Sequence, residues 1–161
     1  MQSKEFSSYV PLRDGSAVWV AGDLITFKLV GKDTGGQFAV AEDETPPGGG
    51  PPPHIHRRED ELFYVLEGEY EFLIGDETIR AGAGSVVYGP RNVTHTFRNP
   101  GPDPAKMVAF VTPPGLEHFL SEVGAPAIEG STAPSFGKAE IERMLAVAPE
   151  YDIEIKAPPP E

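Results

Sequence analysis

Turn-forming residues interrupt this chain so often that long helices are excluded from most of it. There are 18 glycines and 18 prolines in 161 residues, and the apolar runs between them are short. Short runs rich in β-branched and aromatic residues, bounded by Gly, Pro, Asn and Asp, are typical of β-strands. The predicted strands are Ala17–Ala21, Leu24–Val30, Gln37–Ala41, a strand that begins at His54, Glu61–Leu66, Tyr70–Ile74, Thr78–Arg80, Ser85–Tyr88, His95–Asn99 and Lys106–Thr112. This series predicts an all-β sandwich or barrel.

The segment TPPGGGPPP, from Thr45 to Pro53, is the strongest candidate for a domain boundary. Its composition is that of a linker. Strand-like sequence lies on both sides, however, and neither side is long enough to form a domain. We therefore interpret it as a stiff loop that leads into a strand at His54, within a single domain that spans residues 1–161. The barrel core is expected over about residues 17–112.

The pattern changes after the last predicted strand. Leu116–Val123 and Lys138–Val147 both carry apolar residues at helical spacing. We expect two short amphipathic helices on the outside of the barrel, within a helical tail over about residues 114–161. The last residues, Ala157–Glu161, are expected to be frayed.

Charge and residue usage exclude several classes of function. The net charge is −12, and an acidic chain repels phosphate backbones, so no nucleic-acid partner is expected. The chain has no cysteine, which excludes disulfides, thiolate metal sites and cysteine nucleophiles. Met1–Pro11 lacks the pattern of a signal peptide, and no apolar run approaches the roughly 20 residues that span a bilayer. We expect a soluble, cytoplasmic protein without a membrane partner.

Three of the four histidines are placed to share one site. His54 and His56 are two residues apart, so in a strand their side chains lie on the same face. His95 follows a Gly-Pro turn and shares its face with Phe97 and Asn99, whereas the opposite face is polar, so His95 is expected to point into the core. The fourth histidine, His118, is expected at the surface of its helix. Arg57 and Arg58 are interpreted as a solvated pair.

An acidic run close to the first two histidines offers a fourth ligand. Glu59 and Glu61 lie on the same face of the predicted strand, and both of its faces are otherwise apolar, so alternation leaves the choice between them open. Three imidazoles and one carboxylate suit Fe, Mn, Ni, Co, Cu or Zn. The set is too rich in nitrogen for Ca or Mg. Four protein ligands on an octahedral ion leave two positions open, which favours chemistry over a purely structural role.

Two stretches resemble the paired motifs of the cupin superfamily. The first is Gly48-x5-His54-x-His56-x4-Glu61-x6-Gly68, and the second is Gly84-x5-Pro90-x-Asn92-x2-His95-x3-Asn99. Asn92 replaces the glycine that follows the proline in the family. Asn tolerates a left-handed backbone better than most residues, so we expect the turn to be kept.

The resemblance implies a double-stranded β-helix, the cupin jelly-roll barrel. It also implies that His54, His56, Glu61 and His95 are the metal ligands, which resolves the choice of acid. The order of a single barrel core, a helix that starts within Pro113–Phe119 and a tail around Ile141–Ile155 resembles small bacterial monocupins of the quercetin 2,3-dioxygenase-like group. Small cupins are often dimers, so the resemblance also implies a homodimer.

The same resemblance suggests a reaction. Active members of that group open a flavonol ring with O2, and Glu61 would be the catalytic base that takes the proton of the flavonol 3-hydroxyl. A flat aromatic substrate would contact aromatic side chains of the barrel, and the candidates are Phe63, Tyr70, Phe72, Tyr88 and Phe97. Two alternatives remain open: a cupin enzyme that uses no O2 (an isomerase, cyclase or decarboxylase) and a metal-containing module that binds small molecules.

Overall fold

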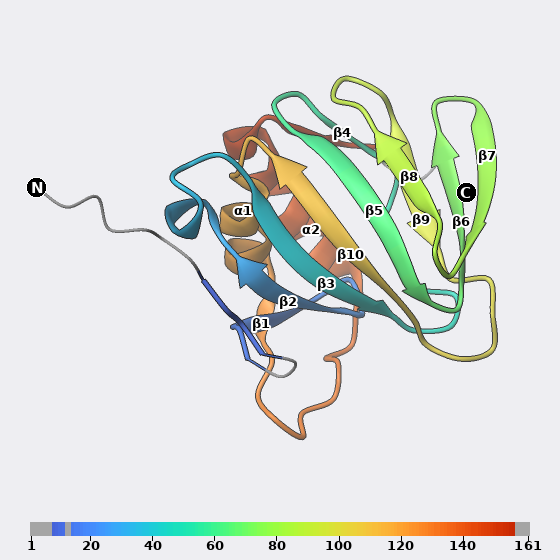
Figure 1. Ribbon diagram of the computed structural model, residues 1–161, viewed down its shortest axis with the longest axis horizontal. Coiled ribbons are helices and arrows are strands. Elements are labelled where there is room, and N and C mark those ends of the chain that lie inside the picture. The colour runs from blue at the N-terminus through green and yellow to red at the C-terminus, as the bar shows by residue number, and fades with distance from the viewer. Residues whose placement is uncertain (1–7, 12–13, 157–161) are drawn as a thin grey trace, which may run out of the picture.

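Two antiparallel β-sheets face each other in the structure, a computed structural model that describes residues 8–11 and 14–156 (Figure 1). The larger sheet has the order β11-β1-β2-β3-β10-β5-β8. Its strands are β1 (Ala17–Val20), β2 (Asp23–Leu29), β3 (Ala39–Thr45), β5 (Asp60–Glu67), β8 (Val86–Gly89), β10 (Ala105–Thr112) and β11 (Ala125–Pro126). The expected fold class, a double-stranded β-helix with short helices, is confirmed.

The smaller sheet has the order β12-β4-β9-β6-β7. Its strands are β4 (His54–His56), β6 (Glu69–Ile74), β7 (Glu77–Gly82), β9 (His95–Arg98) and β12 (Ile153–Ile155). The chain moves repeatedly between the two sheets, so residues far apart in the sequence meet in the space between them. This space holds both the core and the candidate site.

Side-chain alternation along β5 shows how the core is built. Phe63 and Val65 point inward and are buried, whereas Leu62, Tyr64 and Leu66 lie on the outer face and are partly exposed. The apolar cluster around the inward pair includes Tyr70, Phe72, Phe97 and Met107. Both faces of β5 are apolar, which is why alternation alone could not identify the inner face from the sequence.

The proline-glycine segment is a loop between β3 and β4, as the sequence predicted. It is anchored to β9 by Asn99, whose amide N–H donates to the Gly49 carbonyl and whose side chain donates to the Thr45 carbonyl. Gly50 has φ +138°, and a Cβ there would lie 2.0 Å from the Phe97 carbonyl oxygen, so only glycine allows this approach. The loop therefore delivers β4 into the sheet at a fixed position.

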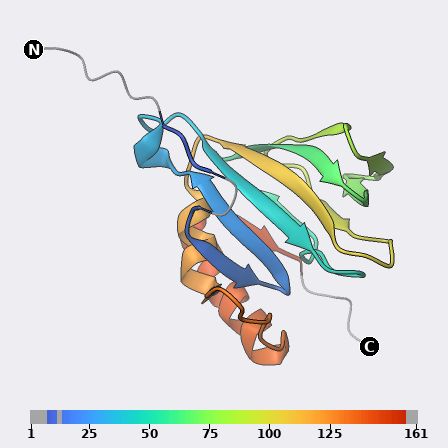
Figure 2. The same cartoon turned by 60° about the horizontal axis from the view of Figure 1, so that its bottom comes forward.

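Both predicted helices form with the expected bounds, as α1 (Leu116–Val123) and α2 (Lys138–Val147). Figures 1 and 2 show them packed beside β1 and β2. The expectation that they lie outside the barrel is wrong in one respect. Leu116, Phe119 and Met144 enter the space between the sheets, where they close its open end.

Four shorter elements differ from the expectation. The segment after α2 contains a 3-10 turn (Ala148–Tyr151) and then β12, which pairs with β4, although a helical tail was expected. The two-residue β11 is likewise a strand within that tail. A further 3-10 turn covers Gly31–Asp33. β3 continues to Thr45, beyond the expected end at Ala41, because its acidic residues 42–44 pair with residues 106–108 of β10. The expected fraying of residues 157–161 falls outside the described residues.

Candidate metal centre

Three strands bring the predicted ligands together. β4 carries His54 and His56, β9 carries His95, and the two strands pair directly through His54 and His95. β5, in the opposite sheet, carries Glu61 on its inner face. One ligand atom from each of the four side chains lies within 4.8 Å of all the others, so the cluster could hold a metal ion.

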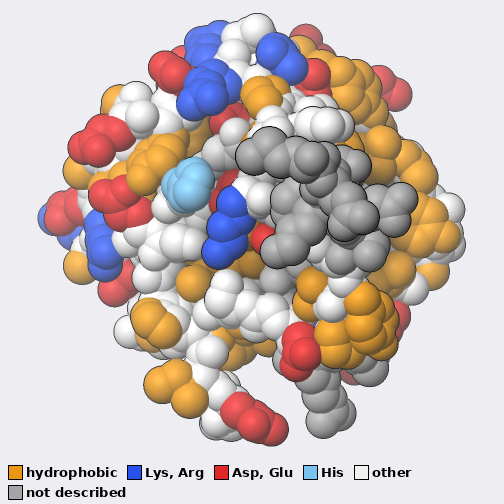
Figure 3. Space-filling view, turned by 60° about the vertical axis from the view of Figure 1, so that its left-hand side comes forward, with side chains coloured by type: hydrophobic (Ala, Val, Ile, Leu, Met, Phe, Trp, Pro, Cys, Tyr) orange, Lys and Arg blue, Asp and Glu red, His pale blue; other side chains and the backbone are white. Residues whose placement is uncertain are grey.

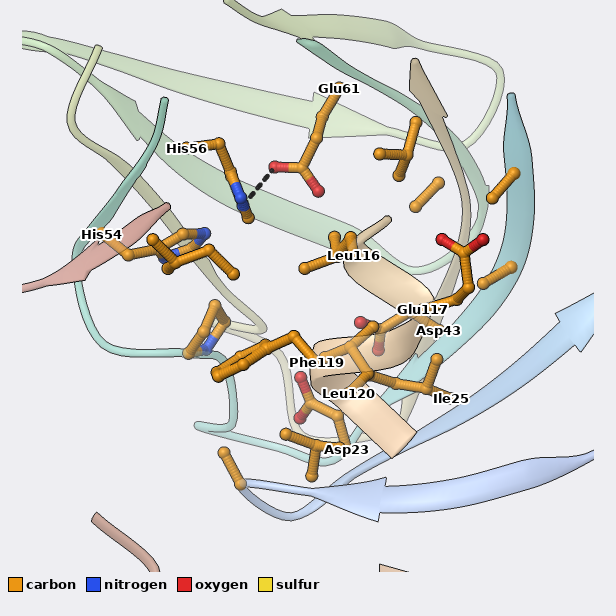
Figure 4. Close-up of a pocket in the computed structure, with 18 of the residues that line it drawn as sticks. Asp23, Ile25, Asp43, His54, His56, Glu61, Leu116, Glu117, Phe119 and Leu120 are labelled. Carbon is orange, nitrogen blue, oxygen red and sulfur yellow. Dashed lines mark ion pairs between the residues drawn. The ribbon is translucent and has the colours of Figure 1, made fainter. Parts of the chain in front are cut away.

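Glu61 is the centre of this cluster. Its Oε2 atom lies 2.7 Å from His95 Nε2 and 3.2 Å from His56 Nε2. Two ligand atoms bound at right angles to one ion, each about 2.1 Å from it, are about 3 Å apart, so these spacings match a shared ion. Figure 4 shows His56 and Glu61 directed toward each other, with His54 beside them.

The opposite ring nitrogens of the three histidines face other partners. His54 Nδ1 lies 2.8 Å from the Pro52 carbonyl oxygen, and His95 Nδ1 lies 3.1 Å from that of Val93. His56 Nδ1 lies 3.6 Å from Oε2 of the buried Glu59. A histidine that donates Nδ1–H to a carbonyl presents a free lone pair on Nε2, which is the arrangement found around metal-ligating imidazoles.

The electrostatics of the cluster favour a bound cation. Burial, together with the neighbouring His56 and His95, lowers the pKa of His54 to about 3, so this imidazole is neutral. Burial would also lower the pKa of His56, but Glu61 and Glu59 raise it to about 10. Burial would raise the pKa of Glu61, but His56 and His95 bring it well below its usual range. Negative charge at Glu61 is thus stabilised by positive charge on its neighbours.

Unsatisfied atoms provide an independent test of whether a metal fits. Among the described residues, both ring nitrogens of His56 and Oε2 of Glu59 are buried without a hydrogen-bond partner. Buried polar atoms are rarely left unpaired. A cation bound to His56 Nε2 would satisfy that nitrogen, and the metal-bound ring would then favour the pairing of Nδ1–H with Glu59. The donor set therefore fits a divalent transition metal.

The cluster opens onto a cavity of about 110 Å³ between the two sheets. Its walls are mostly aliphatic and aromatic, and α1 contributes Leu116, Phe119 and Leu120 (Figure 4). His54, His56 and Glu61 lie at one end. Of the residues that the structure describes, no lysine or arginine lines this cavity. The space thus suits a largely apolar small molecule that reaches the candidate metal centre with a polar group.

The five aromatic residues expected at a substrate are distributed over three environments. Phe63 and Phe97 line the cavity. Tyr70 and Phe72 are fully buried in the core and do not line the cavity. Tyr88 lies on the outer face of β8 and is 56% exposed. The expected contact of Tyr88 with a substrate is therefore wrong, because Tyr88 is the cross-strand partner of the outward Leu62.

Other expectations near the site agree with the structure. His118 is exposed on α1. Arg57 and Arg58 are exposed, and Arg57 pairs with Glu154 of β12 at 2.7 Å. Asn92 has φ +66°, so it adopts the left-handed conformation that the turn requires.

Sequence reasoning missed two kinds of site residue. Glu59 was considered only as an alternative ligand, whereas it lies behind His56. Asp23 and Asp43 were not considered, yet both are buried and line the cavity. Asp43 belongs to an acidic run that resembles a surface strand in the sequence.

Comparisons with known proteins agree with this fold. Residues 42–112 match the family described as "Cupin domain". Quercetin 2,3-dioxygenase from Aspergillus japonicus is 33% identical over 125 residues, which cover 73% of this chain and 35% of that protein. Polyketide synthase CurC from Streptomyces cyaneus is 38% identical over 81 residues, which cover 47% of this chain and 50% of that protein. The chain thus spans between about a third and a half of the length of these two relatives.

A solved structure gives the same fold over the barrel. The protein described as a predicted oxalate decarboxylase from Thermotoga maritima superposes with a TM-score of 0.62 at 19% identity, covering 65% of this chain and 98% of that one. The fold, the two motifs and the domain match define the class of protein. The chain is a member of the cupin superfamily.

Two surface findings bear on partners. Within the described part of the chain, no helix has the length and apolar character that crossing a membrane requires. On the face shown in Figure 3, basic side chains lie among acidic and hydrophobic ones and do not form a continuous basic surface.

Proposed function

We propose that this protein is a metal-dependent dioxygenase that cleaves a flavonol or a related phenolic ring with O2. His54, His56, Glu61 and His95 would hold one divalent transition metal. When bound, such an ion supplies a Lewis acid that favours the deprotonated form of a substrate hydroxyl, together with open positions for reactants. The similarity to the Aspergillus quercetin 2,3-dioxygenase supports this class of reaction.

The observation that carries the proposal is the position of Glu61. Its carboxylate lies at the junction between the histidine cluster and the apolar cavity. A substrate hydroxyl in the cavity would come within reach of this carboxylate, which can accept its proton as a general base. Phe63 and Phe97 would contact the ring, and the apolar walls would exclude bulk water from it.

The lack of a lysine or arginine in the described cavity wall favours this substrate class over a small anion with two charged ends. A dicarboxylate or phosphate bound there would have no lysine or arginine as a partner. A neutral phenol loses much less hydration free energy on entering an apolar cavity, and its ring gains apolar contacts. The overall reaction adds both atoms of O2 to the flavonol and releases one carbon atom as carbon monoxide, so it needs no other oxidant.

An oxygen-uptake assay tests the proposal. Metal-loaded protein should consume O2 with at least one member of a panel of flavonols and catechols, in step with the loss of the substrate. Glu61→Gln should lower kcat by at least about 100-fold, whereas His118→Gln, which changes an exposed histidine of α1, should leave it unchanged. No O2 uptake with any member of the panel would contradict the proposal.

The Streptomyces relative favours a second candidate. It is described as a polyketide synthase and not as an oxygenase, and a cupin that isomerises, cyclises or decarboxylates its substrate would use the same ligands without O2. Turnover under strictly anaerobic conditions would support this candidate. If Glu61→Gln still binds the ligand, and neither the wild type nor this variant turns it over, the result would instead support a binding module. The homodimer and the cytoplasmic location remain predictions.

A further inference from the structure

Three acidic side chains apart from the candidate ligand Glu61 line the cavity. The carboxylate of Glu117 accepts from the N–H groups of Gly31 and Gly115, which leaves Asp23 and Asp43 as a pair. Asp23 and Asp43 are 3% and 7% exposed, and both line the cavity. They belong to neighbouring strands: Asp43 of β3 pairs with Ile25 of β2, and Asp23 precedes Ile25 by two residues on the same face. Figure 4 shows them across the cavity from His54, His56 and Glu61.

Asp23 is buried, yet one of its carboxyl oxygens has no hydrogen-bond partner in the described part of the chain. Among the described residues, its Oδ1 atom is buried and accepts no hydrogen bond. A buried oxygen without a hydrogen-bond partner destabilises the folded protein. Since this side chain lines a cavity and not the packed core, a ligand group in the cavity can supply the missing hydrogen bond.

Asp43, in contrast, is held by a chain of hydrogen bonds. The Tyr70 hydroxyl donates to Thr45 Oγ1 at 3.1 Å, and the Thr45 hydroxyl donates to Asp43 Oδ1 at 3.0 Å. Tyr70 and Thr45 are both fully buried. The chain fixes the orientation of the Asp43 carboxyl and makes it the acceptor of the pair.

The two carboxyls cannot both ionise at low cost. Burial, and for Asp23 the nearby Asp43, raise their pKa values to about 9 and about 7. Asp23 therefore keeps its proton at neutral pH and presents a donor. Asp43 has the lower pKa and already accepts from Thr45, so it is the first of the two to ionise and the acceptor of the pair. A hydroxyl both donates and accepts hydrogen bonds, so it matches this pair, whereas an ammonium group only donates.

We propose that Asp23 and Asp43 form a second polar subsite, which binds a neutral hydroxyl group of the ligand at the end of the cavity opposite the candidate metal centre. The ligand would then be a mostly apolar molecule with two polar ends. This inference deepens the proposed function, because it assigns the substrate a second hydroxyl. It relies on that function only for the metal-binding end of the ligand.

Three aromatic probes of similar size test the subsite without any turnover. Naphthalene, 2-naphthol and 2-(aminomethyl)naphthalene are titrated into the metal-loaded full-length chain by calorimetry at pH 7. We expect 2-naphthol to bind about 10-fold more tightly than naphthalene, the ratio that one good hydrogen bond to a charged group provides. Tighter binding of the amine than of the alcohol would overturn the proposal, because the pair would then be a cation site.

Substitutions test whether the preference for 2-naphthol over naphthalene depends on Asp23 and Asp43. Asp23→Leu should abolish the 10-fold ratio while keeping the affinity for naphthalene, which reports that the cavity is intact. Asp23→Asn should retain a ratio above one, because an amide still forms hydrogen bonds. Glu44→Gln, which alters the adjacent outward-facing acid of β3, should leave the ratio at its wild-type value.

One further variant separates this subsite from the metal centre. His56→Ala removes a predicted ligand, and the preference for 2-naphthol should survive in it. Loss of the preference in His56→Ala, or its survival in Asp23→Leu, would mean that the metal centre binds the hydroxyl and would overturn the inference. A preference that behaves as expected in a protein that consumes no O2 would contradict the proposed dioxygenase and leave the subsite supported.

Discussion

At the scale of single residues, the acid pair determines how stability depends on pH. Asp23 has a folded-state pKa of about 9 against an ordinary value of 3.8, so the folded protein binds a proton that the unfolded chain releases. The resulting stabilisation is complete below about pH 4 and is lost as the pH rises through 9. Asp43, with a pKa of about 7, acts in the same direction.

Asp23→Asn should flatten this dependence. The amide cannot ionise, so the variant should lose less stability than the wild type between pH 5 and pH 9, and its Tm should be the higher of the two at pH 9. Thermal unfolding at a series of pH values measures this. Glu77→Gln, which changes an exposed acid of β7, serves as the control and should follow the wild-type curve. Parallel Tm curves for the wild type and Asp23→Asn would show that Asp23 is ionised throughout.

Glu59 provides a second prediction at this scale. Its Oε2 atom lies 3.6 Å from His56 Nδ1, and neither atom has another partner among the described residues. If Glu59 orients His56 for a metal, Glu59→Gln should weaken metal affinity by about 10–100-fold. Competition with a chelator of known affinity measures the change. Unchanged affinity would show that His56 is oriented by its strand alone.

The residues of the site were predictable to different degrees. The spacing of His54 and His56, together with the polarity around His95, was sufficient to place three imidazoles on inner faces. The choice of Glu61 required the family motif, because Glu59 lies on the same face. Asp23 and Asp43 escaped prediction because burial of an acid depends on the cavity around it, and the sequence does not show where that cavity lies.

At the scale of elements, β12 supports the strand that carries two predicted ligands. Ile153 pairs with His56, Ile155 pairs with His54, and Ile153 is 4% exposed within the cluster that contains Phe119. Ile153→Ala should lower the free energy of unfolding by about 2–5 kcal/mol, because it leaves a cavity in this cluster. Chemical denaturation measures the loss.

The neighbouring outward residue is a suitable control. Glu154→Ala removes an exposed ion pair with Arg57 and should cost less than about 1 kcal/mol. Equal losses in Ile153→Ala and Glu154→Ala would contradict the packing described for β12.

The elements also show where sequence patterns suffice. The bounds of α1 and α2 were predictable, since each helix shows a helical period over at least two turns. β12 and β11 were not predictable, because segments of two or three residues are too short to show a period. Their pairing depends on partners more than 70 residues away, as for Ile153 with His56. The inward position of α1 also depends on the tertiary structure. An amphipathic pattern shows that one face of a helix is buried, but it does not show which element covers that face.

At the scale of the whole molecule, the outer face of the larger sheet is suited to self-association. Leu62 of β5 pairs with Tyr88 of β8, Tyr64 pairs with Val86, and all four side chains point outward and are 37–56% exposed. A contiguous apolar patch at a sheet edge is typical of an interface. We therefore expect the homodimer implied by the family resemblance to form through this face.

Light scattering coupled to gel filtration tests this expectation. The wild type should have twice the mass of one chain, and the double variant Leu62→Asp, Tyr88→Asp should have the mass of a monomer. Leu73→Asp, which changes an exposed leucine of the smaller sheet, should remain a dimer. A monomeric wild type would exclude a stable dimer.

The metal content of the purified protein tests the central claim most directly. Inductively coupled plasma mass spectrometry should find about one divalent transition metal ion per chain after loading and removal of excess metal. His54→Ala, His56→Ala and His95→Ala should each reduce this content to well below half, whereas His118→Ala should retain it. A content near zero in the loaded wild type, or equal contents in all four variants, would contradict a metal centre at these residues.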